Sequence, residues 1–376
     1  MAEYKTLVKK IPVSPDKKTK QKDYLKKGRL PIVDQGQSLV GGYTDDADMA
    51  VKCELPVIVF GDHTRAVKYI TFPFGAGADG IKVLQPKENV LPLFLYYATQ
   101  YIVAKMPNRG YARHYQYVEK EDLPVPPLPE QERIVTRIEE LFSQLDAGVE
   151  TLKKTKAQLS VYRQAVLKEA FESVIPESDT CNVEDVCKDI KVGIVIKPAQ
   201  YYTSADVGVR AFRSANVREF AVNDSDWVYL TKAGHEANLR SEIHTGDVLV
   251  VRSGYPGTAC VVPPTYNGCN AIDILIAVPY AEKILPEYLC AYTNSPLGKR
   301  IIQEKKRGVA QAHFNVSGYS KTPIIVPCLE TQKRVVAEID SRLSVCDSIE
   351  QTVDAALQQA EAMRQSILKD AFEGRL

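Results

Sequence analysis

The ten residues RQAVLKEAFE, at Arg163 to Glu172, return almost unchanged as RQSILKDAFE, at Arg364 to Glu373. The two copies are 201 positions apart, and the same offset relates LPEQERIV from Leu128 to LETQKRVV from Leu329. An offset shared by separate segments indicates that a long stretch was duplicated. Because only two copies occur, the pattern predicts two tandem units and not a solenoid of many repeats.

The duplication extends upstream into segments of a different character. Four further matches follow, the second of which needs a gap of three residues. LPVPP from Leu123 matches IIVPC from Ile324, and RGYARHYQYV from Arg109 matches RGVAQAHFNV from Arg307. LPLFLYYAT from Leu91 matches LPEYLCAYT from Leu285, and LPVIVFGD from Leu55 lies opposite GDVLVVRS from Gly246. The repeated unit is therefore a mixed globular domain followed by one long helix.

Apolar residues recur at a spacing of three and four through both helical segments, with one break near Lys156. The positions are Ile134, Ile138, Leu141, Leu145, Val149, Leu152, Leu159, Val166 and Ala170 in the first, and Val335, Ile339, Leu343, Cys346, Ile349, Val353, Ala360, Ile367 and Ala371 in the second. We predict helices of about 38 residues, each spanning roughly 57 Å at 1.5 Å per residue. Another helix is needed to shield such a narrow stripe, so the two should pair as a coiled coil.

The direction of this pairing follows from connectivity. The second globular domain begins where the first helix ends and ends where the second helix begins, and compact domains hold their termini close together. The helices should therefore run antiparallel, with one domain at each end and pseudo-twofold symmetry. We predict an α+β chain with a first globular domain at 1–127, a central helix at 128–175, a second globular domain at 176–327 and a C-terminal helix at 328–376.

Within the domains, short apolar runs bounded by Gly, Asp and Pro predict strands, and longer apolar segments predict helices. The strands are expected at Val57 to Phe60, Ala66 to Phe72, Asp247 to Ser253 and Thr258 to Pro263, and the helices at Leu93 to Val103 and Pro286 to Ile302.

Composition places the chain among ordinary globular proteins. Its 376 residues suit two domains, with 45% hydrophobic and 25% charged residues. No apolar run reaches the length of a membrane span, and the N-terminus does not have the pattern of a signal peptide. None of the eight cysteines forms a CxxC pair or has a His at metal-ligand spacing, which favours reduced structural thiols in the cytoplasm.

Positive charge is unevenly distributed along a chain whose net charge is only +1. Between Lys5 and Arg29 there are ten Lys or Arg residues against two Asp residues, and a second basic run holds Lys299, Arg300, Lys305, Lys306 and Arg307. Such runs are either solvated faces or contacts to a polyanion, and neither run decides between these by itself.

The common catalytic motifs are missing. The sequence has no P-loop, no GxGxxG after a strand, no HExxH and no Asn/Asp-Pro-Pro-aromatic motif of adenine methyltransferases. His63 follows Asp62, but no Ser or Cys nucleophile stands at motif spacing, so a surface or hydrogen-bonded histidine is the better interpretation. We predict no catalytic residue, no cofactor and no metal site in this chain.

The chain resembles the specificity (S) subunit of type I restriction–modification systems over essentially its whole length. The resemblance is carried by PVPPLPEQERIVTRIEELF at Pro124 to Phe142, by the helix ends LKEAFE and LKDAFEGRL, and by the order domain, helix, domain, helix. LPIVDQGQSLVGGYTDD, LPVIVFGDHTRAVKYI and GDVLVVRSGYPGTACVVP are also similar to signatures inside that family's target-recognition domains.

The resemblance implies a non-catalytic subunit whose two target-recognition domains each read one half of a bipartite, asymmetric target in double-stranded DNA. The helices would set the spacer between the half-sites and hold two modification (M) subunits, which methylate adenine N6 with S-adenosylmethionine. Restriction (R) subunits would add translocation and cleavage driven by ATP and Mg. This chain would itself bind no cofactor, and the complex would act in the cytoplasm without contact to a membrane.

One departure concerns the start of the first domain. The second domain opens with CNVEDVCKDIKVG, which is similar to the family's first strand and turn, whereas only MAEYKTLVKKIPVSP precedes the basic run in the first. Two explanations stay open: the first domain lacks its initial strand, or the chain starts at an unusual position.

The residues expected to contact DNA are Arg, Lys and small polar residues on loops, since Arg, Asn and Gln match the edges of guanine and adenine, and Lys contacts phosphates. About half of the base-contacting candidates are expected to serve loop solvation or local backbone bonding instead. The residues expected to contact DNA in the first domain are Asp62, His63, Thr64, Arg65, Arg109, Arg113, His114 and Gln116. Those in the second domain are Ser214, Asn216, Arg218, Arg252, Ser253, Tyr255, Lys305, Lys306, Arg307, Gln311, His313 and Asn315. The residues expected to contact phosphates are Lys17, Lys18, Lys20, Lys22, Lys26 and Lys27.

Three alternatives stay open at this point. The chain could serve a methyltransferase-only complex without a nuclease, which neighbouring genes would reveal. It could be a coiled-coil adaptor with no DNA role, although the clustered basic residues argue against that. It could also be an enzyme with an unrecognised site, which the missing motifs disfavour.

Overall fold

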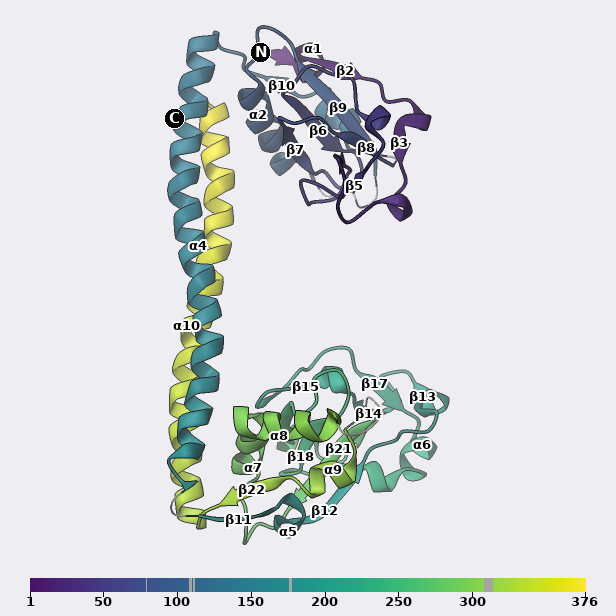
Figure 1. The fold of residues 1–376 in the computed structure, drawn as a ribbon, viewed down its shortest axis with the longest axis vertical. Helices are drawn as coiled ribbons and strands as arrows, with labels where there is room; N and C mark the ends of the chain where they lie inside the picture. Colours follow the sequence, from purple (N-terminus) through teal and green to yellow (C-terminus); the bar gives the residue numbers. More distant parts are fainter. Residues whose placement is uncertain (79, 108–109, 111, 176–177, 308–313) are drawn as a thin grey trace. The chain divides into compact units, whose positions relative to one another are not determined.

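The computed structural model describes residues 1–376 except 79, 108–109, 111, 176–177 and 308–313, and the chain divides into two compact units (Figure 1). Unit 1 comprises Met1–Lys153 with Asp354–Leu376, and unit 2 comprises Lys154–Val353. Each unit contains one globular domain and a part of each long helix, α4 (Leu128–Glu172) and α10 (Leu329–Phe372). At 45 and 44 residues, these helices exceed the predicted length because each begins before the first residue of its apolar stripe, Ile134 or Val335.

The domain of unit 1 is built on two four-stranded sheets. The first sheet is antiparallel and has the order β2-β9-β6-β7, and the second has the order β3-β8-β4-β5 with β8 parallel to both neighbours. Helix α2 (Pro92–Lys105) covers the outer face of the first sheet. The strands are β2 (Val8–Ile11), β3 (Lys18–Thr19), β4 (Leu30–Val33), β5 (Gly42–Thr44), β6 (Val57–Gly61), β7 (Val67–Ile70), β8 (Gly75–Gly77) and β9 (Ile81–Pro86).

The apolar run of β6 has no polar alternation because both faces of the first sheet are covered. Ile58 and Phe60 belong to the core shared with α2, whereas Val57 and Val59 belong to the core shared with the second sheet. Successive side chains of a strand point to opposite faces, so one continuous apolar run fills two cores.

Unit 2 also contains two four-stranded sheets, of which the first has the equivalent strand order and the second a different one. Its first sheet has the order β12-β21-β18-β19 and its second the order β13-β17-β14-β20, with β14 and β20 parallel. In β18, Val248 and Val250 belong to the core shared with helix α7, whereas Leu249 and Val251 belong to the core shared with the second sheet. The strands are β12 (Cys187–Val192), β13 (Tyr202–Thr203), β14 (Val209–Phe212), β17 (Val228–Leu230), β18 (Val248–Val251), β19 (Ala259–Val261), β20 (Asn270–Ala271) and β21 (Ile274–Pro279).

The helix predicted from Pro286 to Ile302 is two helices, α7 (Pro286–Asn294) and α8 (Pro296–Arg307). Ser295 separates them with ψ of 157°, because a residue before proline is disfavoured in the helical region. The Ser295 hydroxyl then accepts from the Gly298 N–H at 3.1 Å and satisfies a donor in the first turn of α8.

The first domain does have an initial strand. Strand β1 (Ala2–Glu3) pairs antiparallel with β10 (Asp122–Leu123), and a single turn of helix, α1 (Tyr4–Leu7), leads into β2. The second domain opens in the same way, with β11 (Asp179–Asn182) paired to β22 (Pro323–Val326), then α5 (Val183–Val186) and β12. The explanation that the first domain lacks this strand is therefore wrong.

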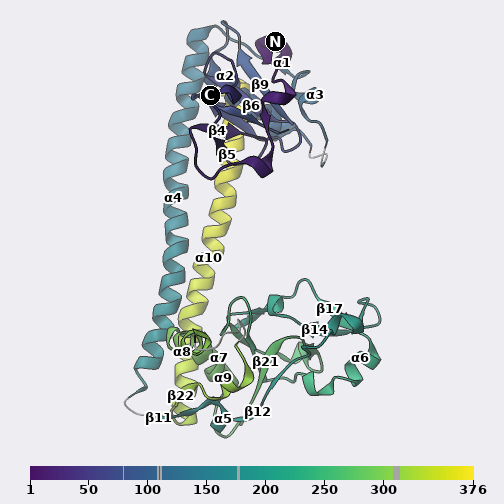
Figure 2. The same ribbon diagram turned by 45° about the vertical axis from the view of Figure 1, so that its right-hand side comes forward.

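Within each unit the segments of α4 and α10 lie side by side and run antiparallel (Figures 1 and 2). In unit 2, the Arg163 guanidinium donates to Asp347 at 2.6 Å and to Glu350 at 3.1 Å. In unit 1, the equivalent Arg364 donates to Asp146 and lies 4.2 Å above the Phe142 ring. The arginine that begins each repeated ten-mer thus links the two helices.

The phenylalanine of each ten-mer attaches its helix to a domain. Phe171 packs edge-on against Tyr288 and Tyr292 of α7, with ring centroids 5.3 and 5.2 Å away. Phe372 packs against Phe94 and Tyr101 of α2 at 5.2 and 5.4 Å. The last turns of α4 therefore belong to the core of the second domain, and the last turns of α10 to the core of the first.

Candidate nucleic-acid interface

In the first domain, the loop after β6 is joined to the segment before helix α3 (Tyr115–Val118). The Asp62 carboxylate accepts from the Tyr115 N–H at 2.8 Å and lies 3.4 Å from the Lys82 ammonium. The Asp62 carbonyl accepts from the His114 N–H at 2.9 Å and lies 3.0 Å from the His114 Nδ1. Both residues are at most 3% exposed, so Asp62 and His114, expected to contact DNA, serve the fold instead.

The turn between β6 and β7 is held in place by hydrogen bonds to backbone carbonyls of the same domain. The Thr64 hydroxyl donates to the Gln35 carbonyl, and Arg65, which has a φ of 61°, donates from Nη1 to the Met106 carbonyl at 3.2 Å. Thr64 is exposed, whereas His63 and Arg65 are half-buried.

Two exposed side chains lie at the start of α3: Arg113 just before the helix and Gln116 in it. The Gln116 Nε2 donates to the Arg113 carbonyl at 3.0 Å. Arg109 lies outside the described residues.

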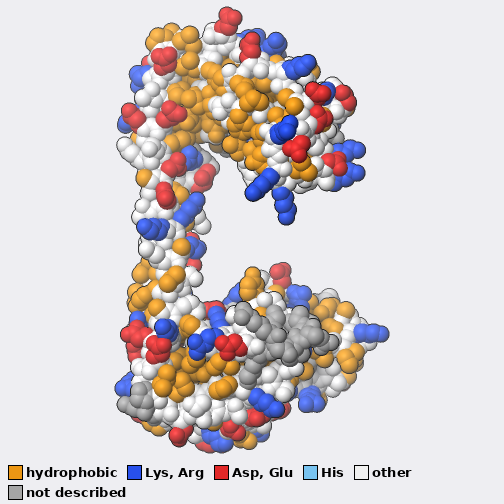
Figure 3. Space-filling view, viewed as in Figure 1, with side chains coloured by type: hydrophobic (Ala, Val, Ile, Leu, Met, Phe, Trp, Pro, Cys, Tyr) orange, Lys and Arg blue, Asp and Glu red, His pale blue; other side chains and the backbone are white. Residues whose placement is uncertain are grey.

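The basic run of the first domain lies on short elements around β3. Lys17, Lys20, Lys22, Lys26 and Lys27 are exposed. Lys18 is half-buried, because it lies on β3 itself and pairs with Ala76 of β8. Figure 3 shows Lys and Arg side chains near β3 and β5, with Asp and Glu among them. Exposed lysines on a short segment suit contacts to phosphates, which position a protein on DNA without reading its sequence.

The segment LPIVDQGQSLVGGYTDD forms a structural cluster around Asp34. The Lys68 ammonium, on a side chain 4% exposed, donates to the Asp34 carbonyl at 2.8 Å and lies 3.5 Å from its carboxylate. Burial lowers the pKa of Lys68, while burial and the nearby Asp34 charge raise the pKa of Tyr24 to about 12. A Cβ atom at Gly41 or Gly77 would collide with Asp34, which explains these glycines.

Three expected contact residues of the second domain have structural partners. Arg252 donates to the Asp273 carboxylate at 3.0 Å and to the Phe314 carbonyl at 3.2 Å. Asn216 is fully buried and donates to the carbonyls of the turn that precedes β17. Asn315 caps helix α9 (Val316–Ser320) by accepting from the Gly318 N–H at 2.8 Å.

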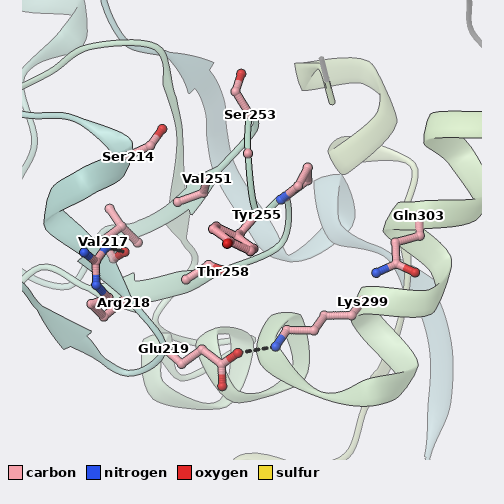
Figure 4. Close-up of a pocket in the computed structure, with 12 residues that line it drawn as sticks. Ser214, Val217, Arg218, Glu219, Val251, Ser253, Tyr255, Thr258, Lys299 and Gln303 are labelled. Carbon is pink, nitrogen blue, oxygen red and sulfur yellow. Dashed lines mark hydrogen bonds and ion pairs between the residues drawn. The ribbon is translucent and has the colours of Figure 1, made fainter. Parts of the chain in front are cut away.

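Four other expected residues come together around one hollow of about 670 Å³ (Figure 4). Its walls are the turn before β15 (Val217–Arg218), the β18–β19 hairpin and helix α8. Tyr255 stands at the hairpin tip with 84% of its surface exposed, between Gly254 and Gly257, whose φ angles are 78° and 90°. The polar side chains that line the hollow are Ser214, Arg218, Glu219, Ser253, Tyr255, Thr258, Lys299 and Gln303.

Glu219, Lys299 and Gln303 are not among the residues predicted to contact DNA. The Lys299 ammonium forms an ion pair with the Glu219 carboxylate across the hollow. The one signal in the sequence is that Lys299 begins the second basic run. Arg300 of that run is exposed beside Lys299, whereas the side chains of Lys305, Lys306 and Arg307 at the end of α8 are not described. Gln311 and His313 lie outside the described residues.

Neither a metal cluster nor a membrane span is found in the described part of the chain. It contains no group of three His, Cys, Asp or Glu residues placed to hold a metal ion. None of its helices is both long and apolar enough to cross a bilayer.

A family model described as the type I restriction modification DNA specificity domain matches residues 10–160, which cover most of the first domain and the first part of α4. Over these residues the chain is similar to the type I specificity-subunit family. The resemblance seen in the sequence is thereby confirmed.

Curated specificity subunits are similar over part of their length. The EcoBI specificity subunit of Escherichia coli is 26% identical over 282 residues, and the EcoKI subunit of E. coli strain K12 is 26% identical over 274. Each alignment covers 68% of this chain and 58% of its relative.

Solved structures show the same fold. A chain from a structure on complex assembly and conformational transition of the type I R-M system has a TM-score of 0.73 and 17% identity, covering 100% of this chain and 97% of the other. The HsdS subunit from Thermoanaerobacter tengcongensis has a TM-score of 0.51 and 18% identity, with 100% and 96% covered. The predicted α+β class, with two domains each followed by a long helix, is confirmed.

Proposed function

We propose that this chain is a type I specificity subunit that reads a bipartite, asymmetric DNA target, one half with each domain, on behalf of modification subunits that methylate adenine N6 with S-adenosylmethionine. It contributes recognition, and the modification subunits contribute chemistry and cofactor. In a complex that also restricts, restriction subunits add ATP- and Mg-dependent cleavage. The complex meets its DNA in the cytoplasm.

The observation that carries this proposal is a duplicated scaffold with divergent loops. In both domains the first sheet has the equivalent strand order, and the long helices attach in the same way. Their β6–β7 and β18–β19 hairpins differ, since the first is held close to the domain's backbone by Thr64 and Arg65 while the second projects Tyr255. A shared scaffold with different exposed side chains suits two modules that read different base sequences, because base edges are distinguished by the side chains that reach them.

The helices support a role in holding partner subunits. Several apolar side chains of α4 and α10 are exposed although they lie on paired helices: Val161 at 71%, Val345 at 57% and Met363 at 48%. Exposed apolar residues on a helix pair suit a protein contact. We propose that the modification subunits dock along this pair and that helix length sets the spacer between the half-sites.

The test is co-production of the chain with the modification subunits encoded beside it, followed by mapping of methylated adenines in the host genome. We expect one bipartite motif with a fixed spacer, and tight DNA binding whose affinity falls steeply with salt. The purified chain alone should transfer no methyl group. Methyl transfer by the chain alone, or a complex without sequence-specific binding, would overturn the proposal. Cleavage of unmethylated DNA after addition of restriction subunits separates a restricting complex from a methyltransferase-only one.

A further inference from the structure

The Glu219 carboxylate is an unusual group for the face of a DNA-binding domain. DNA phosphates repel carboxylates, so a Glu near the duplex is unfavourable unless its charge is balanced or its acceptor oxygens are used. Here the charge is balanced, because the Lys299 ammonium of α8 pairs with it. The Glu219 side chain is nevertheless 39% exposed, so the pair leaves part of the carboxylate accessible from the hollow.

Glu219 is also held in position by its backbone. It lies in the turn between β15 and β16 (Ala221–Val222), where Arg218 pairs with Ala221. The next residue, Phe220, has a φ of 62° and donates its N–H to the Ala259 carbonyl of β19 at 3.0 Å. Buried Asn216 fixes the segment just before β15. A carboxylate held both by its turn and by Lys299 can discriminate between ligands, since little freedom is lost on binding.

An ionised carboxylate only accepts hydrogen bonds and has about four acceptor positions. In the major groove, the amino groups of cytosine N4 and adenine N6 are donors, whereas guanine O6 and thymine O4 are acceptors. A fixed carboxylate therefore favours an amino-bearing base on the strand it faces and repels a keto-bearing base there.

From this geometry we propose that Glu219 is a specificity-determining residue of the second domain, which accepts a hydrogen bond from the amino group of a cytosine or adenine at one position of its half-site. Lys299 is a positioning residue that holds the carboxylate and balances its charge. The inference rests on the proposed reading of DNA by this chain, and it adds which group selects a base and which chemical class of base it selects.

The test uses the complete complex with modification subunits and compares wild type, Glu219→Gln and Glu236→Gln. The Glu219→Gln change keeps size and shape but adds a donor, so the position should accept keto-bearing bases as well. Glu236 lies exposed on α6 (Lys232–Glu236), outside the hollow, and its change removes the same charge from the same domain. The readouts are the methylated motif in a host genome and equilibrium binding to duplexes that differ at single positions.

We expect Glu219→Gln to relax one position of one half-site, where wild type prefers cytosine or adenine by roughly ten-fold or more. Glu236→Gln should leave the motif unchanged. An unchanged motif in the Glu219→Gln complex overturns the inference, and so does a loss of preference at every position of the half-site. Those failures differ from failure of the proposed function, in which the wild-type complex itself shows no sequence preference. The binding assay decides the matter even if the variant complex no longer methylates.

Discussion

Gln131 and Gln332, which lie at equivalent places in the first turns of α4 and α10, make the same three hydrogen bonds in the two units. The Gln131 amide accepts from the Leu91 N–H at 2.8 Å and donates to the Asn89 and Pro126 carbonyls at 3.1 and 2.8 Å. The Gln332 amide accepts from the Leu285 N–H at 2.9 Å and donates to the Lys283 and Pro327 carbonyls at 3.0 and 2.9 Å. Both side chains are fully buried, so each glutamine connects the start of a long helix to its domain.

Replacing either glutamine by alanine should destabilise its own unit. Gln332→Ala leaves the Leu285 N–H and two carbonyls without this partner, and we expect a loss of about 2–4 kcal/mol in the stability of unit 2. Gln131→Ala should do the same to unit 1. Hydrogen-exchange mass spectrometry of the whole chain checks both, since protection should fall near α7 in one variant and near α2 in the other.

The matched control for these substitutions is Gln359→Ala, an exposed position on α10. It should change stability by no more than about 0.5 kcal/mol. Equal effects of Gln332→Ala and Gln359→Ala would contradict the assigned role of the buried amides.

The bridge from Arg163 to Asp347 and Glu350 should stabilise the helix pair of unit 2 by a salt-dependent amount. The Arg163 side chain is 24% exposed, so solvent screens it only in part. We expect Arg163→Met to cost about 0.5–1 kcal/mol at low salt. The cost should shrink in 1 M NaCl, where the screening length falls to about 3 Å. Urea unfolding at both salt concentrations measures this.

Lys168→Met serves as the comparison, because Lys168 pairs with Glu172 on its own helix and both side chains are largely exposed. Its effect should be smaller than that of Arg163→Met at low salt. An equal loss from both variants, independent of salt, would show that Arg163 acts through packing and not through its charge.

Cys328 should be the most reactive thiol. It is exposed just before α10, and a hydrogen bond with the Thr331 hydroxyl lowers its pKa, so the reactive thiolate forms at lower pH than in an ordinary cysteine. Burial raises the pKa of Cys187 and Cys260 to about 12 and that of Cys269 to about 11, so these thiols stay protonated at pH 8.

Alkylation with iodoacetamide, followed by peptide mass spectrometry from pH 6 to 9, checks this order. Cys328 should be labelled first, and Thr331→Val should move its rate profile to higher pH. Labelling of Cys260 at the rate of Cys328 in the folded protein would contradict the prediction.

Exchanging the second domain, about residues 180–327, for that of a relative should change one half of the recognised sequence only. Each domain has its own cores and its own sheets, so the exchange leaves the first domain's surface intact. Methylated-base mapping of the hybrid complex measures the outcome. A change in both half-sites would show that the domains do not read independently.

Helix length should set the spacer. Inserting four residues between Lys154 and Gln158, where the apolar stripe is already interrupted, adds about one turn and up to roughly 6 Å to α4. That approaches two base-pair steps of about 3.4 Å. The half-sites should stay the same while the spacer between them grows by one or two base pairs.

The same four residues inserted in the exposed loop 204–207 of the second domain should leave the spacer unchanged. Methylated-base mapping compares the two insertions. If the complex with the helix insertion still recognised the original spacing and did not recognise the longer one, the helices would not measure the site.

Neighbouring residues in the sequence were sufficient to determine the duplication, the two long helices and the central strands. The apolar spacing from Ile134 and the run Val57 to Phe60 predict α4 and β6, because periodicity and β-branched composition act locally. The resemblance to type I specificity subunits followed from the same repeated segments. Even locally, the break at Ser295 was missed, although Pro296 signals it.

The tertiary structure alone decided which of the polar residues expected to contact DNA are exposed and which serve the fold. Asp62, His114 and Asn216 have the residue types of base readers, but partners elsewhere in the fold draw them into the interior. Glu219 and Lys299 are 80 positions apart, and no local pattern pairs them. The reason is physical: a polar side chain is buried or exposed according to the distant backbone groups that the fold brings within hydrogen-bonding distance, and those are set only when the sheets and helices pack.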